Sequence, residues 1–198
     1  MMQETVDLGL DELIYDSESD PVLRAINKER LRIKDKFDPL VEEIATQDVD
    51  IAGITTLADA GNLIMTVRGY YHRVQAIYGE VLIEKRLAQI RRDASKNKAQ
   101  ARVSELIHAD PEVRAISGQQ AQMARAQSKA KSELALASGC QDLYLLVYGY
   151  AERVQAALDD LRYAAQDLRE FTRTMRDAKA LGETGVLPEG AVAGLMKW

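Results

Sequence analysis

The sequence predicts an all-α protein built on a long antiparallel helical hairpin or coiled coil, with shorter N-terminal helices and flexible tails. Three observations support this fold class. Aromatic residues make up only 6% of the 198 residues and apolar residues 46%, and abundant Ala, Leu, Gln, Arg and Glu favour helix. Two long segments place apolar residues at alternating intervals of three and four, as coiled coils do. A ten-residue phrase recurs in both of these segments.

The repeated phrase occupies residues 67–76 and 147–156, with seven identities. Both copies carry a glycine at the same mid-helix position, where glycine costs roughly 1 kcal/mol relative to alanine. We therefore expect two helices to approach closely and cross antiparallel there. The residues expected at this crossing are Gly69, Tyr70, Val74, Gly149, Tyr150 and Val154. A binding pocket lined by the two tyrosines is the alternative interpretation.

The chain divides by pattern into four parts. These are an acidic tail over residues 1–20, short helices and a connector over 21–56, the hairpin domain over 57–180 and a C-terminal tail over 181–198. Asp20 supplies an N-cap acceptor and Pro21 a favourable first helical residue, so a helix is expected over 21–36. Asp38-Pro39 should interrupt it before a second short helix, and residues 47–56 read as a connector.

The first long helix begins near Leu57. Its apolar seam is Ala60, Ile64, Val67, Tyr71, Val74, Tyr78, Val81, Lys85 and Ala88. Polar residues enter the seam near Lys85, so we expect the apolar partner surface to end there. The helix is expected to fray through residues 95–97.

The second long helix follows a polar stretch. Asp110 and Pro111 predict a capped helix start, and residues 118–132 form a Gln- and Ala-rich segment expected to face solvent or to bridge to another subunit. The second seam is Cys140, Leu143, Val147, Tyr150, Val154, Ala157, Leu161, Ala164, Leu168, Phe171, Met175 and Ala178. Gly182, Gly185 and Pro188 are expected to end this helix.

Charge is distributed unevenly along the chain. Residues 1–20 contain seven carboxylates and no Lys or Arg, whereas the other residues carry 26 basic against 24 acidic side chains. A basic segment with Asp93 as its one acidic residue contains Lys85, Arg86, Arg91, Arg92, Lys96, Lys98 and Arg102. On a helix, Lys85, Arg92 and Lys96 share one face, and Arg91, Lys98 and Arg102 share the adjacent face. The segment is either a strip that follows a phosphate backbone or a solvated helix face.

The tails contain candidate docking residues. These are Leu10, Leu13, Ile14 and Tyr15 among the N-terminal carboxylates, and Leu195 and Trp198 near the C-terminal end. The acidic tail has three interpretations: an amphipathic helix that docks on a basic partner, a disordered solubilising tail, or a shield for the basic segment of the same protein.

Catalytic signatures are not evident. His72 and His108 lack partners at zinc-ligand spacing, and no Walker, dinucleotide or GxSxG motif occurs, so we expect no enzyme, no metal and no cofactor. The single Cys140 is expected to be a small buried hydrophobe in a reducing compartment. Neither a signal peptide nor a membrane span is expected, which suggests a soluble cytoplasmic protein without membrane partners.

Residues 70–153 resemble the UvsY-type recombination mediators of tailed bacteriophages and related phage coiled-coil early proteins. The words that carry the resemblance are Glu105-Leu-Ile-His-Ala109-Asp110-Pro-Glu-Val113 and Ala135-Leu-Ala137-Ser138-Gly139, although the arginine expected after the serine is absent. The resemblance implies a ring-forming accessory protein that binds single-stranded DNA and assists a recombinase.

Two hypotheses follow. The first is a non-enzymatic, homo-oligomeric helical accessory protein that binds single-stranded nucleic acid through the basic segment, in the cytoplasm of a host cell, with a recombinase or another phage protein as partner. The second is a structural or assembly component of a phage virion or another large complex. The basic segment favours the first, and the two tails favour the second.

Overall fold

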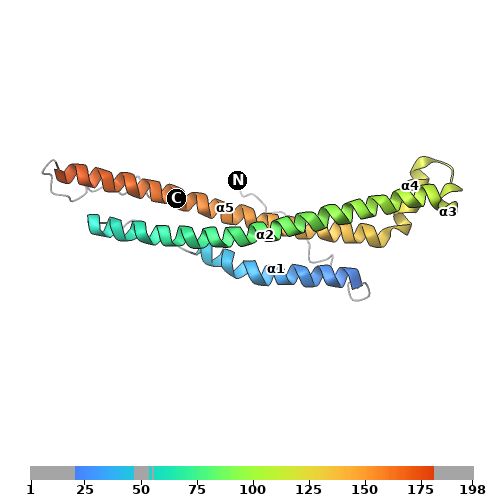
Figure 1. The fold of residues 1–198 in the computed structure, drawn as a ribbon, viewed down its shortest axis with the longest axis horizontal. Helices are drawn as coiled ribbons and strands as arrows, with labels where there is room; N and C mark the ends of the chain where they lie inside the picture. The colour runs from blue at the N-terminus through green and yellow to red at the C-terminus, as the bar shows by residue number, and fades with distance from the viewer. Residues whose placement is uncertain (1–20, 47–53, 55, 181–198) are drawn as a thin grey trace, which may run out of the picture. The chain divides into compact units, whose positions relative to one another are not determined.

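The computed structural model describes residues 21–46, 54 and 56–180, and the described residues form five helices and no strand (Figure 1). The helices are α1 (Pro21–Ala45), α2 (Leu57–Ala109), α3 (Pro111–Arg114), α4 (Gln119–Lys129) and α5 (Lys131–Ala180). The predicted all-α class is therefore confirmed. The two predicted tails and most of the predicted connector lie outside the described residues.

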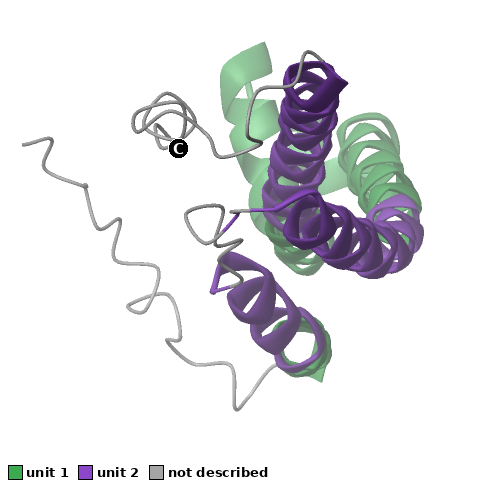
Figure 2. Ribbon diagram, turned by 90° about the vertical axis from the view of Figure 1, so that its left-hand side faces the viewer, with its two compact units in different colours: residues 1–34, 87–146 green, residues 35–86, 147–198 purple. Residues whose placement is uncertain are grey.

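The chain divides into two compact units, coloured green and purple in Figure 2. Unit 1 comprises Met1–Lys34 and Leu87–Leu146, and unit 2 comprises Asp35–Arg86 and Val147–Trp198. Each of the three long helices therefore contributes one segment to each unit. The predicted divisions at residues 56 and 180 do not coincide with this partition.

Unit 2 is built on antiparallel segments of α2 and α5. Val67, early in α2, packs in a cluster with Leu168, late in α5, whereas Lys85 lies over the ring of Tyr148. The complete cluster is Ile54, Ala60, Val67 and Leu168, with Leu63, Ile64, Leu161, Ala165 and Phe171 packed against it. The three-four spacing thus forms the buried seam that it predicts.

The seam of α2 continues beyond the predicted end at Lys85. Ala88, Ala99 and Leu106 are buried in unit 1, and Ser95 is only 7% exposed. The Ser95 hydroxyl donates to the Arg92 carbonyl at 2.9 Å, which satisfies a polar group at a buried position without fraying the helix. The expected fraying at residues 95–97 was wrong, because the small Ser95 and Ala99 side chains maintain the buried face.

The repeated phrase does not mark a close helix crossing. A Cβ added at Gly69 or at Gly149 would meet no atom within 4 Å, so the close approach expected at these glycines was wrong. Val67 of the first copy instead packs with Leu161 and Leu168. Val74, Tyr150 and Val154 are buried, and Tyr70 is half-buried. Each copy of the repeated phrase therefore supplies buried residues to the seam of its own helix.

The α1 helix runs without interruption through Pro39, so the two short helices predicted there are one. Phe37 is fully buried, and its ring centroid lies 5.7 Å from that of Tyr150. The Tyr150 hydroxyl donates a hydrogen bond to Asp38. These contacts, which directly precede the proline, offset the backbone hydrogen bond that it removes.

The turn between α2 and α5 lies in unit 1 and contains α3 and α4 (Figure 1). Asp110 caps α3 by accepting from the Glu112 and Val113 amides, as its position before Pro111 predicts. Val103, Leu106, Val113, Ala126 and Ala130 form a buried cluster. The segment expected to face solvent therefore buries two of its alanines in this cluster.

Candidate interaction surface on α2

The basic segment lies on continuous α2, with Lys85 and Arg86 in unit 2 and the other five residues in unit 1. In unit 2, the Lys85 ammonium lies 4.3 Å from the ring centroid of Tyr148. Arg86 is exposed. The larger portion, in unit 1, presents two different faces.

The first face, which we call the aromatic face, contains Arg92, Lys96 and Tyr144. The Arg92 guanidinium carbon lies 4.2 Å from the ring centroid of Tyr144 on α5, and Arg92 Nε donates to Asp93 at 2.9 Å. This hydrogen bond to Asp93 raises the pKa of Arg92 further above its ordinary value. Lys96, one turn beyond Arg92, is exposed. A planar cation stacked on a tyrosine therefore stands beside a second cation.

The second face, which we call the outer face, contains Leu87, Ile90, Arg91, Ala94 and Lys98. Leu87 is 44% exposed and Ile90 is 53% exposed, at a spacing of three residues that places them together on the helix. Arg91 and Lys98 follow one edge of this apolar pair, seven residues apart. The outer face is thus apolar with a basic edge, and is fully within unit 1.

Several cations of the basic segment already contact carboxylates. Arg91 Nη1 lies 2.6 Å from Glu29 on α1, and Arg102 Nη1 lies 2.8 Å from Glu105. Hydrogen bonds from Arg32 and from Arg91 hold the pKa of the Glu29 carboxyl below its ordinary value. Lys98 is close enough to Glu133 to help lower the pKa of that carboxyl, which a hydrogen bond from Ser132 lowers most. Exposed ion pairs are weak, so an anionic ligand competes with them at small cost.

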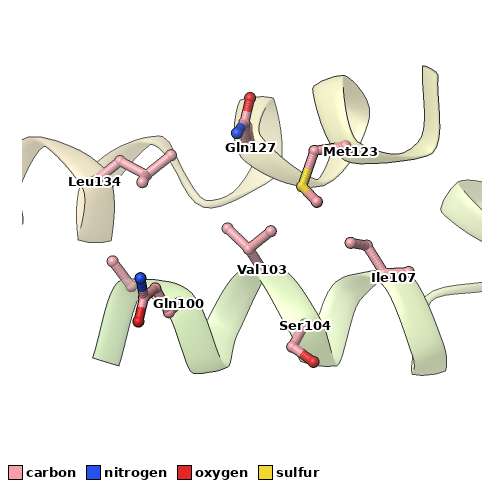
Figure 3. Close-up of a pocket in the computed structure, with 8 residues that line it drawn as sticks. Gln100, Val103, Ser104, Ile107, Met123, Gln127 and Leu134 are labelled. Atoms are coloured by element: carbon pink, nitrogen blue, oxygen red, sulfur yellow. The ribbon is translucent and has the colours of Figure 1, made fainter. Parts of the chain in front are cut away.

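A shallow apolar groove of about 340 Å³ lies beside the hairpin turn of unit 1. Figure 3 shows Val103 and Ile107 of α2 on one wall, with Met123 of α4 and Leu134 of α5 opposite them. The polar residues at its edges, Gln100, Ser104 and Gln127, are uncharged. This groove was not predicted, because it forms only where three helices meet.

Other predicted site features can be placed only in part. Among the described residues, no group of three or more His, Cys, Asp or Glu is arranged to hold a metal ion. Cys140 is buried, as expected for a residue of the seam. No helix in the described ranges is long and apolar enough to cross a membrane. The candidate docking residues Leu10, Leu13, Ile14, Tyr15, Leu195 and Trp198 lie outside the described residues.

Sequence reasoning missed Tyr144 and the pair Leu87 and Ile90. Tyr144 is 52 residues from Arg92, and only the pairing of α2 with α5 brings them together. The apolar pair was detectable in principle, because Leu87 and Ile90 interrupt the basic segment at helical spacing off the seam.

Comparisons with known proteins identify no relative. No family model matches the chain, no curated protein matches it, and no solved structure matches it. The resemblance to UvsY-type phage mediators therefore stays a prediction.

Proposed function

We propose that this chain is a non-catalytic helical accessory protein that binds single-stranded nucleic acid on the aromatic face of α2. The observation that carries the proposal is the stacked pair of Arg92 and Tyr144 with Lys96 one turn away. Proteins that bind single strands combine cations for the phosphates with aromatic or guanidinium planes for the bases. The basic segment itself contains no aromatic residue, so Tyr144 of α5 supplies what the segment lacks.

The mode of binding follows from this chemistry. Arg92 and Lys96 neutralise phosphates, and the ring of Tyr144 supports base stacking that tolerates any sequence. Phosphate displaces the Asp93 carboxylate from Arg92, since Asp93 is exposed and the ion pair is only partly shielded from solvent. A phage recombination mediator is one protein that would use such binding, and it remains part of this proposal.

Fluorescence anisotropy with a labelled oligothymidylate of about 20 nucleotides tests the proposal across a salt series. Arg92→Ala with Lys96→Ala should lower the slope of log affinity against log salt by about 1.4, because each lost phosphate contact removes about 0.7. The matched control is Arg91→Ala with Lys98→Ala, which removes the same charge from the outer face of the same helix. Equal losses in both double variants, or no binding at low salt, would refute the proposed site.

Substitution of Tyr144 separates stacking from charge. Tyr144→Phe should keep most of the affinity, because the ring remains, whereas Tyr144→Ala should weaken binding at every salt concentration by about 1–3 kcal/mol without changing the slope. Equal affinities of the Phe and Ala variants would exclude stacking on this residue.

The second candidate function, an assembly component, is favoured by the exposed apolar pair Leu87 and Ile90. Exposed apolar residues that cluster on a helix commonly mark association surfaces. Light scattering over a range of protein concentrations tests this candidate: a mass that falls to that of the monomer on Leu87→Ser with Ile90→Ser supports it, and a wild-type monomer at all concentrations opposes it.

A further inference from the structure

The start of α1 lies close to the outer face of α2 in unit 1. Glu29 of α1 reaches Arg91, whereas Ile26, one turn nearer the start of α1, contacts Gly139 of α5. Gly139 is five residues before Tyr144, which lies beside Arg92. Because α2 and α5 are antiparallel, Ile26 is further along α2 than Arg91, and α1 begins towards Lys98.

Helix geometry gives the level at which α1 begins. Pro21 precedes Glu29 by eight residues, or about 12 Å, and Lys98 follows Arg91 by seven residues, or about 10 Å. The chain therefore enters α1 approximately level with Lys98. Residues 1–20, which precede α1, are thereby tethered beside the outer face.

The tethered segment and the outer face have complementary chemistry. Residues 7–16 read DLGLDELIYD, in which four carboxylates alternate with Leu8, Leu10, Leu13, Ile14 and Tyr15. The outer face offers apolar Leu87 and Ile90 with Arg91 and Lys98 along one edge. Arg91 already contacts Glu29, and Lys98 lies near Glu133, so the carboxylates of residues 7–16 compete with these two for the cations. Such exchange costs little, because ion pairs near the surface are weak.

The tether is long enough for this contact. Ile90 is eight residues from Lys98 along α2, or about 12 Å. Tyr15 is six residues before Pro21, and six extended residues span up to about 20 Å. Residues 7–16 therefore reach both the apolar pair and the basic edge without unfolding α1.

We infer that residues 7–16 dock in cis on the outer face of α2, with their apolar side chains on Leu87 and Ile90 and their carboxylates on Arg91 and Lys98. Of the three interpretations of the acidic tail, the inference selects the shield for the basic segment of the same protein, and it names the outer face of α2 as the surface that is covered. The docked segment covers the apolar pair and leaves the aromatic face open. The inference does not depend on nucleic-acid binding.

Carbodiimide crosslinking of the full chain, read by peptide mass spectrometry, tests the docking. Asp7, Asp11, Glu12 and Asp16 should link to Lys98 several-fold more than to Lys96, which is exposed on the same helix two residues away but on the aromatic face. The link should weaken in about 0.5 M NaCl, where the Debye length falls to a few ångströms. Equal yields at the two lysines, or links found only in crosslinked dimers, would overturn docking in cis.

Hydrogen exchange of residues 7–16 tests the apolar part of the contact. Protection of these amides should be lost in Leu87→Ser with Ile90→Ser and kept in Leu145→Ser, which changes an exposed leucine of α5 in the same unit. Unprotected amides in the wild-type chain would refute the docking whatever the oligonucleotide experiment finds. Protected amides in a chain that binds no oligonucleotide would uphold it while refuting the proposed function.

Discussion

At the scale of single residues, three helical glycines have different surroundings. A Cβ at Gly69 or Gly149 would meet nothing within 4 Å, whereas a Cβ at Gly139 would come 3.1 Å from Cγ2 of Ile26 and closer still to its Cδ1. An alanine at position 139 therefore requires the Ile26 side chain to move. The repeated sequence drew attention to the other two glycines, where no neighbour demands one.

Alanine substitution should separate these glycines. Gly69→Ala and Gly149→Ala should each raise the free energy of unfolding by up to about 1 kcal/mol, because alanine is the better helix former and meets no neighbour. Gly139→Ala should raise the free energy of unfolding clearly less, or should lower it, since the Ile26 side chain must move. Urea unfolding followed by circular dichroism provides the comparison, and a similar gain at all three positions would contradict it.

Tyr150 is the residue whose ionisation is most clearly coupled to folding. Burial and, next, the hydrogen bond to Asp38 raise its pKa above the ordinary value. Folding thus favours the neutral phenol. The resulting contribution to the free energy of unfolding is fully present below about pH 10, the pKa of tyrosine in the unfolded chain, and is lost as the pH rises towards the folded pKa. The wild-type free energy of unfolding should therefore fall above pH 10 relative to Tyr150→Phe.

The same variant makes a prediction at neutral pH. Tyr150→Phe keeps the ring beside Phe37 and removes only the hydrogen bond to the Asp38 carboxylate, so it should cost about 1–3 kcal/mol. Denaturant titrations at neutral and alkaline pH measure both effects. A difference between wild type and Tyr150→Phe that stays constant as the pH rises above 10 would refute the coupling.

At the scale of elements, helix ends are set by local signals that the sequence displays. Thr56 and Asp59 form a reciprocal cap at the start of α2: the Thr56 amide donates to Asp59 at 2.9 Å, and the Asp59 amide donates to the Thr56 hydroxyl at 3.1 Å. The Asp110 cap was predicted from the Asp-Pro pair, whereas this one was overlooked in a connector. In α1, the Asp-Pro pair misled, because tertiary contacts kept the helix continuous.

Asp110 combines a cap with an ion pair. Its hydrogen bond with Lys129, 2.7 Å away, is the main cause of a lowered pKa. Folding therefore favours the carboxylate, and the stabilisation is present above the unfolded pKa near 4 and lost as the pH falls through the folded value. Asp110→Asn keeps a cap acceptor without the charge, so it should lower the melting temperature less than Asp110→Ala. Equal decreases in melting temperature in the two variants would show that the cap contributes nothing to stability.

At the scale of the whole molecule, each unit has its own buried cluster, yet α1, α2 and α5 run through both. The residues of both seams are buried or half-buried within the chain, so they pack against each other without a second copy. Among the described residues, exposed large apolar side chains lie off the seams, for example Leu87 and Ile90 of α2 and Leu145 and Tyr163 of α5. Heptad spacing therefore predicts which residues pack inside the fold, but it carries no information about the exposed surfaces.

Continuity of the helices predicts cooperative unfolding. Leu168→Ala in the unit 2 cluster should cost about 2–5 kcal/mol, the usual range for a buried leucine, because Leu168 is only 1% exposed. Leu145→Ala changes a leucine that is 54% exposed and should have little effect. Hydrogen exchange at both ends of α2 should show one shared loss of protection in Leu168→Ala. Loosening confined to unit 2 would show that the units unfold separately.

The sequence by itself determined the helical class, the two seams and the capped start of α3, because these depend on spacing and local capping that recur every few residues. Tertiary structure alone decided which glycine has a close neighbour, that α1 passes through Pro39, and that the Arg92 guanidinium lies over the ring of Tyr144. These features arise from contacts between residues far apart in the chain, whose pairing no local pattern specifies. The position of α1 beside α2 likewise decided which face of α2 lies next to Pro21, the first residue of α1.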